Sequence, residues 1–342
     1  MSQTPSPLHL LWMMVALFSS SCEDELDVSA PYQEQYVVYG LLDISEARHT
    51  LRIQKLYQNN NLSAATVAQR PDSIYPPDNI EVLVIESNPN NLQSLDTLRF
   101  VRDTLNSKDE GLFASQPHVL YRSERDKLLN SAFDYELLIR NPAVNYQIRS
   151  NTRLVGKPRF GTFPREGFGF EFTDQEDVSQ SIYKIEFTPG PNARSFGISL
   201  RFFYEERMDG GPWTPKTLDL SITGAETQFI RGGNLIERFY DGGSLFRRLG
   251  NRLEAADNIQ RRLIDSAVFV VANAEEELEN YIRLSQVSGG PVESAPQYTN
   301  VENGLGVFSS RSQSSRWVRF NQNSKDTLRF GRFTEDLNFQ LP

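Results

Sequence analysis

Alternating apolar and polar residues recur along the chain from Tyr36 onward and predict short β-strands. The segment Thr50–Tyr57 alternates strictly, which places Leu51 and Ile53 on one face of a strand. Similar segments follow, separated by turn residues such as Asn141-Pro142. The strands expected in this region cover residues 36–42, 50–57, 80–85, 96–101, 133–140 and 145–154. The pattern predicts a mainly β fold that begins with an immunoglobulin-like antiparallel sandwich over residues 35–156.

Gly156-Lys157-Pro158 marks the predicted junction to a second region, residues 157–342. Its expected strands cover residues 169–172, 183–188, 198–204, 217–223, 263–272, 304–308, 317–320 and 326–330. Ser244 is placed to cap one short helix, and Asn273 with Glu276 forms a capping-box pattern that opens another. The second region is therefore predicted to be a β-rich α+β domain with two short helices.

The first residues differ from this pattern and indicate an export signal. Leu8–Phe18 is apolar and has the length of a signal-peptide core, and three serines then lead to Cys22. Cys22 is the sole cysteine, so a disulfide within one chain is excluded. This arrangement resembles a bacterial lipobox, whose cysteine receives a diacylglycerol group. It predicts a lipoprotein signal peptide over residues 1–21; the alternative is a buried terminal cysteine after an ordinary cleaved signal.

An acidic segment follows the cysteine. Glu23, Asp24 and Glu25 resemble the acidic stretch that follows the lipidated cysteine in surface-exported lipoproteins of the Bacteroidota. Residues 22–34 are accordingly expected to form an acidic tether, with a plain solvated spacer as the alternative. The predicted location is the outer membrane, lipid-anchored and surface-exposed, with the periplasmic face as the alternative.

Three further segments carry a resemblance to a family of uncharacterised Bacteroidota outer-membrane lipoproteins. They are Val37-Val38-Tyr39-Gly40, the helical segment around Tyr281, and the string from Tyr298 to Phe308. The resemblance implies an accessory lipoprotein of a TonB-dependent outer-membrane transporter, and it implies no catalytic residues.

Charge and side-chain chemistry narrow the function further. The net charge is −9 and no block rich in Lys or Arg occurs, so a nucleic-acid partner is not expected. His49 and His118 lack the spacing of metal ligands. Ser181 and Lys184 match the S-x-x-K motif of penicillin-binding enzymes, but that motif needs a helix to bring the two side chains together, and the segment here is strand-like. No metal or cofactor is predicted. An exposed aromatic, Trp213, is open to two interpretations, a sugar or protein contact or a hinge plug.

The densest group of acidic residues is predicted to form a solvated turn. The alternatives are a calcium site or the acid pair of a glycoside hydrolase. The group comprises Glu171, Asp174, Glu176 and Asp177.

The segment Tyr298–Phe308 is the candidate loop for a partner or ligand. Its candidate residues are Tyr298, Asn300, Asn303 and Gly304. The alternative is a tight loop that leads into a strand closing the second domain, with Leu305, Val307 and Phe308 buried. In that case Gly304 or Gly306 should have a backbone that a Cβ atom would strain.

The predicted function is a non-enzymatic, lipid-anchored binding or accessory module of the cell envelope. The alternatives are a surface glycan hydrolase, with Glu171 and Asp174 or Asp177 as its acids, and a structural envelope protein. The ligand itself has no signature in the sequence.

Overall fold

The computed structural model describes residues 35–56, 66, 69–105, 118–170, 182–222, 233–285 and 298–341. β-Strands dominate these residues, so the predicted mainly β fold is confirmed. Contacts group residues 35–342 into one compact unit. Within the described part of the chain, no helix is long and apolar enough to cross a membrane.

The first seven strands lie side by side in the order β1-β2-β5-β4-β3-β6-β7, each antiparallel to its neighbours. They are β1 (Gln35–Asp43), β2 (Thr50–Leu56), β3 (Glu81–Ser87), β4 (Ser94–Leu105), β5 (His118–Ser123), β6 (Asp134–Asn141) and β7 (Tyr146–Arg153), with the one-turn helix α3 (Pro71–Ile74) after β2. Alternate residues such as Leu51 and Ile53 are buried, as the pattern predicts. These strands enclose the first core, which includes Tyr36, Val38, Val84 and Ile139.

Tyr135, near the start of β6, ties the sheet to the preceding loop. Its hydroxyl accepts a hydrogen bond from the backbone N–H of Asn130 (2.8 Å) and donates one to Glu86 (2.9 Å). A tyrosine bonded back to the chain a few residues upstream is the tyrosine corner found in immunoglobulin-type sandwiches. The sheet itself is mixed, because β1 also pairs in parallel with a strand from the second half of the chain, so the immunoglobulin-like sandwich stays a prediction.

The second half holds the remaining elements. They are β8 (Arg159–Phe160), β9 (Gly169–Phe170), β10 (Ile182–Thr188), β11 (Ser195–Met208), β12 (Thr214–Ser221), β13 (Ile236–Asp241), α4 (Gly242–Arg252), β14 (Ile259–Ala274), α5 (Glu276–Ser285), β15 (Leu305–Phe320), α6 (Gln322–Phe330), the 3-10 turn η2 (Glu335–Leu337) and β16 (Phe339–Gln340). Leu245, Phe246 and Leu249 of α4 and Leu328 of α6 join Phe269 and Val318 in the second core.

Both predicted helices are confirmed as α4 and α5, but the cap of α4 is Asp241, which accepts from the N–H groups of Gly243 and Ser244. The strand predicted at residues 326–330 is wrong, because this segment lies in α6. The carboxamide of Asn321 accepts from the N–H of Ser324 (2.8 Å) and caps that helix, while Leu328 is buried in the second core.

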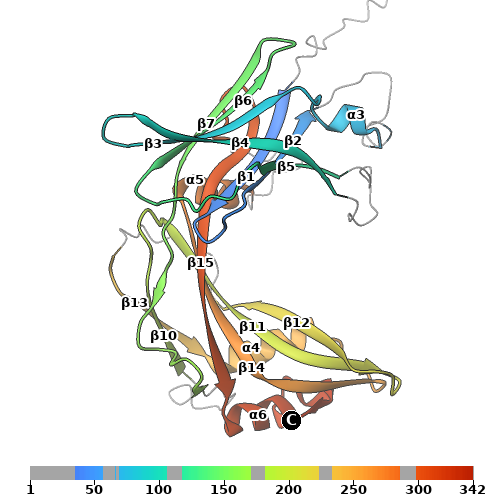
Figure 1. The fold of residues 1–342 in the computed structure, drawn as a ribbon. Coiled ribbons are helices and arrows are strands. Elements are labelled where there is room, and N and C mark those ends of the chain that lie inside the picture. Colours follow the sequence, from blue (N-terminus) through green and yellow to red (C-terminus); the bar gives the residue numbers. More distant parts are fainter. Residues whose placement is uncertain are drawn as a thin grey trace, which may run out of the picture. The chain divides into compact units, whose positions relative to one another are not determined.

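Strand β15 belongs to both halves of the fold (Figure 1). Its first part pairs in parallel with β1, from Val37 opposite Leu305 onward, and its second part pairs with β14, where Ala267 lies opposite Val318. Phe308 is therefore buried in the first core and Val318 in the second. The expectation that this strand closes the second domain is wrong for Phe308. The part of β15 that contains Phe308 pairs in parallel with β1, which belongs to the first half of the fold.

Serine side chains hold the connector between the halves against β15. The hydroxyls of Ser310, Ser312 and Ser314 donate to the carbonyl oxygens of Arg153, Gly156 and Pro158, each at 2.6 Å. The predicted junction at residue 156 separates the two cores, although its standing as a domain boundary stays a prediction.

Candidate functional site

A cavity of about 790 Å³ lies where side chains of both halves meet. The β3–β4 hairpin, β6 and β7 supply one part of its wall, and the start of α5 supplies another. Its lining residues are Ile85, Ser87, Leu92, Ser94, Asp134, Glu136, Asn151, Thr152, Arg153, Asn192, Arg194, Glu275, Glu276 and Glu277. Concave sites of this size between structural units are the usual places where proteins bind ligands.

The start of α5 is fixed by a carboxylate. Glu275 precedes the helix and accepts hydrogen bonds from the N–H of Glu277 (2.8 Å) and the hydroxyl of Ser309 (3.0 Å). Burial raises the pKa of the Glu275 carboxyl above its ordinary value, and these hydrogen bonds only partly oppose that shift. Two N–H groups at this helix end therefore have acceptors, since the N–H of Glu277 donates to Glu275 and that of Leu278 donates to the Ser309 hydroxyl (3.1 Å).

Both arginines of the wall lie beside carboxylates. Arg153 meets Asp134 at 3.1 Å, and Arg194 meets Glu276 at 3.6 Å. The lining holds the carboxylates of Asp134, Glu136, Glu275, Glu276 and Glu277 against these two guanidinium groups. The cavity is therefore negatively charged even after its arginines are counted.

Leu92 at the cavity rim has an unusual conformation and an unusual exposure. Its backbone φ is +56°, and 78% of the residue is exposed to solvent. Its N–H donates to the carbonyl of Asn88 (2.8 Å), which holds the hairpin loop in this shape. A large apolar residue in the left-handed region is strained, and such residues gather at functional sites.

The predicted loop lies beside this cavity and is firmly bonded to the fold. The side chain of Asn300 donates to the carbonyl of Phe308 (2.7 Å) and accepts from its N–H (3.0 Å). The carboxamide of Asn303 donates to Gln147 (3.2 Å), and the Tyr146 hydroxyl donates to the Asn303 carbonyl. Asn300 and Asn303 thus have structural roles, as the alternative interpretation of this loop expects.

Tyr298 reaches the cavity wall at the start of α5, and Asn300 reaches it at the carbonyl of Asn151 (3.5 Å). The Tyr298 hydroxyl donates to the carboxylate of Glu277. Burial, followed by this hydrogen bond, raises the pKa of Tyr298 to about 12. Tyr298 therefore remains a neutral hydrogen-bond donor that positions Glu277.

The glycine prediction for this segment is confirmed at Gly306. Its φ is +103°, and a Cβ atom there would lie 2.0 Å from the carbonyl oxygen of Val38. Gly304 lacks a positive φ, but its Cβ would come within 3.0 Å of the Tyr36 oxygen. Val307 and Phe308 are buried as expected, whereas Leu305 is half-buried. In this turn the residue with a positive φ is Asn303, at +57°.

Several residues singled out by the sequence lie outside the described residues. They are Cys22, Glu23, Asp24 and Glu25 at the start, Glu171, Asp174, Glu176 and Asp177 of the acidic group, and Ser181. The geometry of that acid group therefore stays a prediction.

The other singled-out side chains lie away from the cavity lining. His49 is buried, with Nε2 3.0 Å from the Lys127 carbonyl oxygen, and His118 begins β5. Trp213 packs against two guanidinium groups, those of Arg207 and Arg262, 4.5 and 4.9 Å from the ring centroid.

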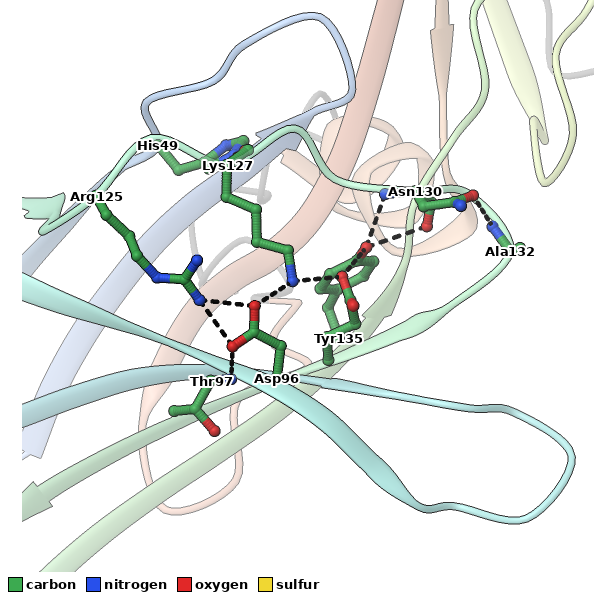
Figure 2. A network of polar contacts seen from close by, with 9 residues as sticks. His49, Asp96, Thr97, Arg125, Lys127, Asn130, Ala132 and Tyr135 are labelled. Atoms are coloured by element: carbon green, nitrogen blue, oxygen red, sulfur yellow. Dashed lines mark hydrogen bonds and ion pairs between the residues drawn. The ribbon is translucent and has the colours of Figure 1, made fainter.

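A polar network between the β3–β4 hairpin and the loop before β6 has no signature in the sequence (Figure 2). Lys127 lies 2.6 Å from Asp96 and 3.0 Å from Glu86, and Arg125 contacts both oxygens of Asp96. The hydrogen bonds from Lys127 and then Arg125 hold the pKa of Asp96 far below its ordinary value. These contacts fix the hairpin that carries Leu92, because Asp96 is on its second strand.

No group of three His, Cys, Asp or Glu side chains is placed to hold a metal ion among residues 35–341 as far as they are described. The carboxylates of the cavity are instead engaged by arginine, serine, tyrosine or backbone N–H groups.

Comparison with known proteins adds little to this geometry. No family model matches the chain, and no curated protein matches it significantly. Among solved structures it is similar to the C-terminal globular domain of an oligosaccharyltransferase from Pyrococcus abyssi, with 11% identity and a TM-score of 0.25. The match covers 70% of this chain and 47% of that one, so the chain spans less than half of the matched structure's length. A likeness this weak carries no argument about function.

Proposed function

We propose that the chain is a lipid-anchored binding module of the cell envelope, acting at the outer membrane beside a TonB-dependent transport system. The observation that carries the binding role is the cavity at α5, with the strained and exposed Leu92 at its rim. The anchor is supported by the lipobox-like segment ending at Cys22 and by the acidic residues after it.

The wall of the cavity supports binding because its charged groups are held in place. Glu275 is fixed by Ser309 and a backbone N–H, Glu277 by Tyr298, and Asp134 by Arg153. Prearranged side chains lose little conformational entropy when a partner docks, which favours affinity.

Co-purification from membranes in mild detergent tests the proposal. The wild-type chain should fractionate with the outer membrane and retain a partner protein, whereas Cys22→Ser should release the chain into the soluble fraction. The variant Leu92→Asn should remain anchored but lose the partner. Membrane association unchanged in Cys22→Ser, or a partner retained equally by Leu92→Asn, would contradict the anchor or the cavity, respectively.

A further inference from the structure

We infer that the cavity at α5 receives a segment of a partner protein that carries lysine or arginine side chains and at least one apolar residue. This inference rests on the proposed function and adds the chemistry of the partner.

Charge selects a cationic partner. Five carboxylates and two guanidinium groups line the cavity. Arg153 and Arg194 already lie against Asp134 and Glu276, so neither is available to an incoming anion without breaking an existing ion pair. The five carboxylates are also engaged, Glu136 by Arg149 at 2.8 Å, but each of these contacts uses one of the two carboxylate oxygens, so a cationic group can bind the other oxygen without breaking them.

The N-terminal end of α5 at the cavity does not favour the binding of an anion, although helix N-termini ordinarily do. The partial positive charge of a helix start attracts phosphate or carboxylate groups. At α5 this end is occupied by Glu275 itself, which accepts the N–H of Glu277, and Glu276 and Glu277 follow directly. A phosphate, sulfate or acidic peptide would therefore face three carboxylates at this wall.

The rim favours a peptide over a small amine or a metal ion. Leu92 exposes 78% of its surface, and Ile85 lines the same cavity. A bare cation gains nothing from these apolar groups, whereas a polypeptide can bury them beneath its own apolar side chains. The volume of about 790 Å³ also exceeds what a single ammonium group fills.

Three labelled pentapeptides test the charge preference on the purified full-length chain by fluorescence anisotropy. Pentalysine should bind, pentaglutamine should bind weakly and pentaglutamate should not bind. The double variant Glu276→Gln/Glu277→Gln should weaken pentalysine binding at least about fivefold, because it removes two cavity charges and retains the hydrogen-bonding shape.

A matched control separates the cavity from the overall negative charge. Asp326→Asn/Asp336→Asn removes two exposed carboxylates at α6 and η2, so it changes the net charge equally. This variant should bind pentalysine within about twofold of the wild type. Equal weakening in both double variants, or tighter binding of pentaglutamate, would overturn the inference.

A second pair of peptides tests the apolar rim. Leu92→Asn should weaken binding of Lys-Leu-Lys-Leu-Lys and leave pentalysine binding nearly unchanged. Equal effects on the two peptides would overturn the apolar part of the inference. If no cationic peptide binds but the cellular partner still co-purifies in a Leu92-dependent manner, the cationic inference fails and the proposed function stands.

Discussion

Gly306 combines a positive φ with a close approach to backbone, so the fold depends on the absence of a side chain there. Gly306→Ala should lower the free energy of unfolding by about 3 kcal/mol or more, because φ is +103° and the Cβ would lie 2.0 Å from the Val38 oxygen. Urea unfolding measures the loss. Gly197→Ala is the matched control, since a Cβ there meets no atom within 4 Å. Equal stability of the two variants would refute the close parallel packing of β15 on β1.

Leu92 should show a trade-off between stability and binding. Leu92→Asn should raise the free energy of unfolding by about 1 kcal/mol, because asparagine tolerates a positive φ better and the exposed leucine contributes little packing. The same variant should lose partner binding. Thermal unfolding and co-purification measure the two effects, and a destabilised variant would show that Leu92 has a packing role instead.

Glu275 should make stability depend on pH in the direction set by its raised pKa. A carboxyl whose folded pKa is raised contributes stability that is fully present below its unfolded value and is lost as the pH rises through the folded value. Glu275→Gln should therefore be more stable than the wild type at pH 7. This advantage should shrink towards about pH 4. Denaturant unfolding across this range measures it, and an advantage that grows on acidification would contradict the assignment.

At the scale of elements, the local sequence pattern predicted those strands and helices whose formation depends on neighbouring residues. The alternation of Leu51 and Ile53 predicted β2, and the helical pattern predicted that α4 and α5 exist. The predicted caps were wrong: Asp241 caps α4 in place of Ser244, and Asn273 lies in β14, so Glu275 and not Asn273 accepts the N–H of Glu277 at the start of α5. The segment in α6 was predicted as a strand, because its apolar residues are few and the cap at Asn321 was not recognised.

Long-range pairing left no such local signal. The parallel pairing of β1 with β15 joins Val37 to Leu305, and nothing in either segment indicates its partner. The cavity was missed for the same reason, since its wall combines a hairpin tip, two strands and a helix start. Two predicted residues reach the wall, Tyr298 through Glu277 and Asn300 through the carbonyl of Asn151. The turn-forming run Asn88-Pro89-Asn90-Asn91 was the available hint to the hairpin loop that holds Leu92.

The network around Asp96 should stabilise the β3–β4 hairpin. Asp96→Asn should lower the free energy of unfolding by about 1 kcal/mol at pH 7, because Lys127 and Arg125 lose their shared anion. Since the folded pKa of Asp96 is depressed, its contribution is present above the ordinary value of 3.8 and is lost as the pH falls through the folded value. The difference between wild type and variant should therefore narrow below about pH 4. A constant difference across this range in chemical unfolding would exclude a charge effect.

At the scale of the whole described molecule, β15 connects the two cores and sets the geometry of the cavity. The Ser309 hydroxyl on this strand donates to Glu275, and the Ser310 hydroxyl donates to the carbonyl of Arg153. Residues on both sides of the cavity wall are therefore hydrogen-bonded to β15. A surface built in this way is held in one shape by the fold, which favours the proposed binding role.

Site-specific photo-crosslinking in intact cells tests the binding role most directly. A photoreactive phenylalanine derivative at position 92 should capture a discrete partner protein in the envelope, and the yield should fall when Glu276→Gln/Glu277→Gln is added. The same group at position 330 is the control, because Phe330 is also highly exposed, at 64%, and does not line the cavity. Capture at 92 but not at 330 is the predicted result. Equal capture at both positions, or capture at 330 alone, would contradict a binding site at this cavity.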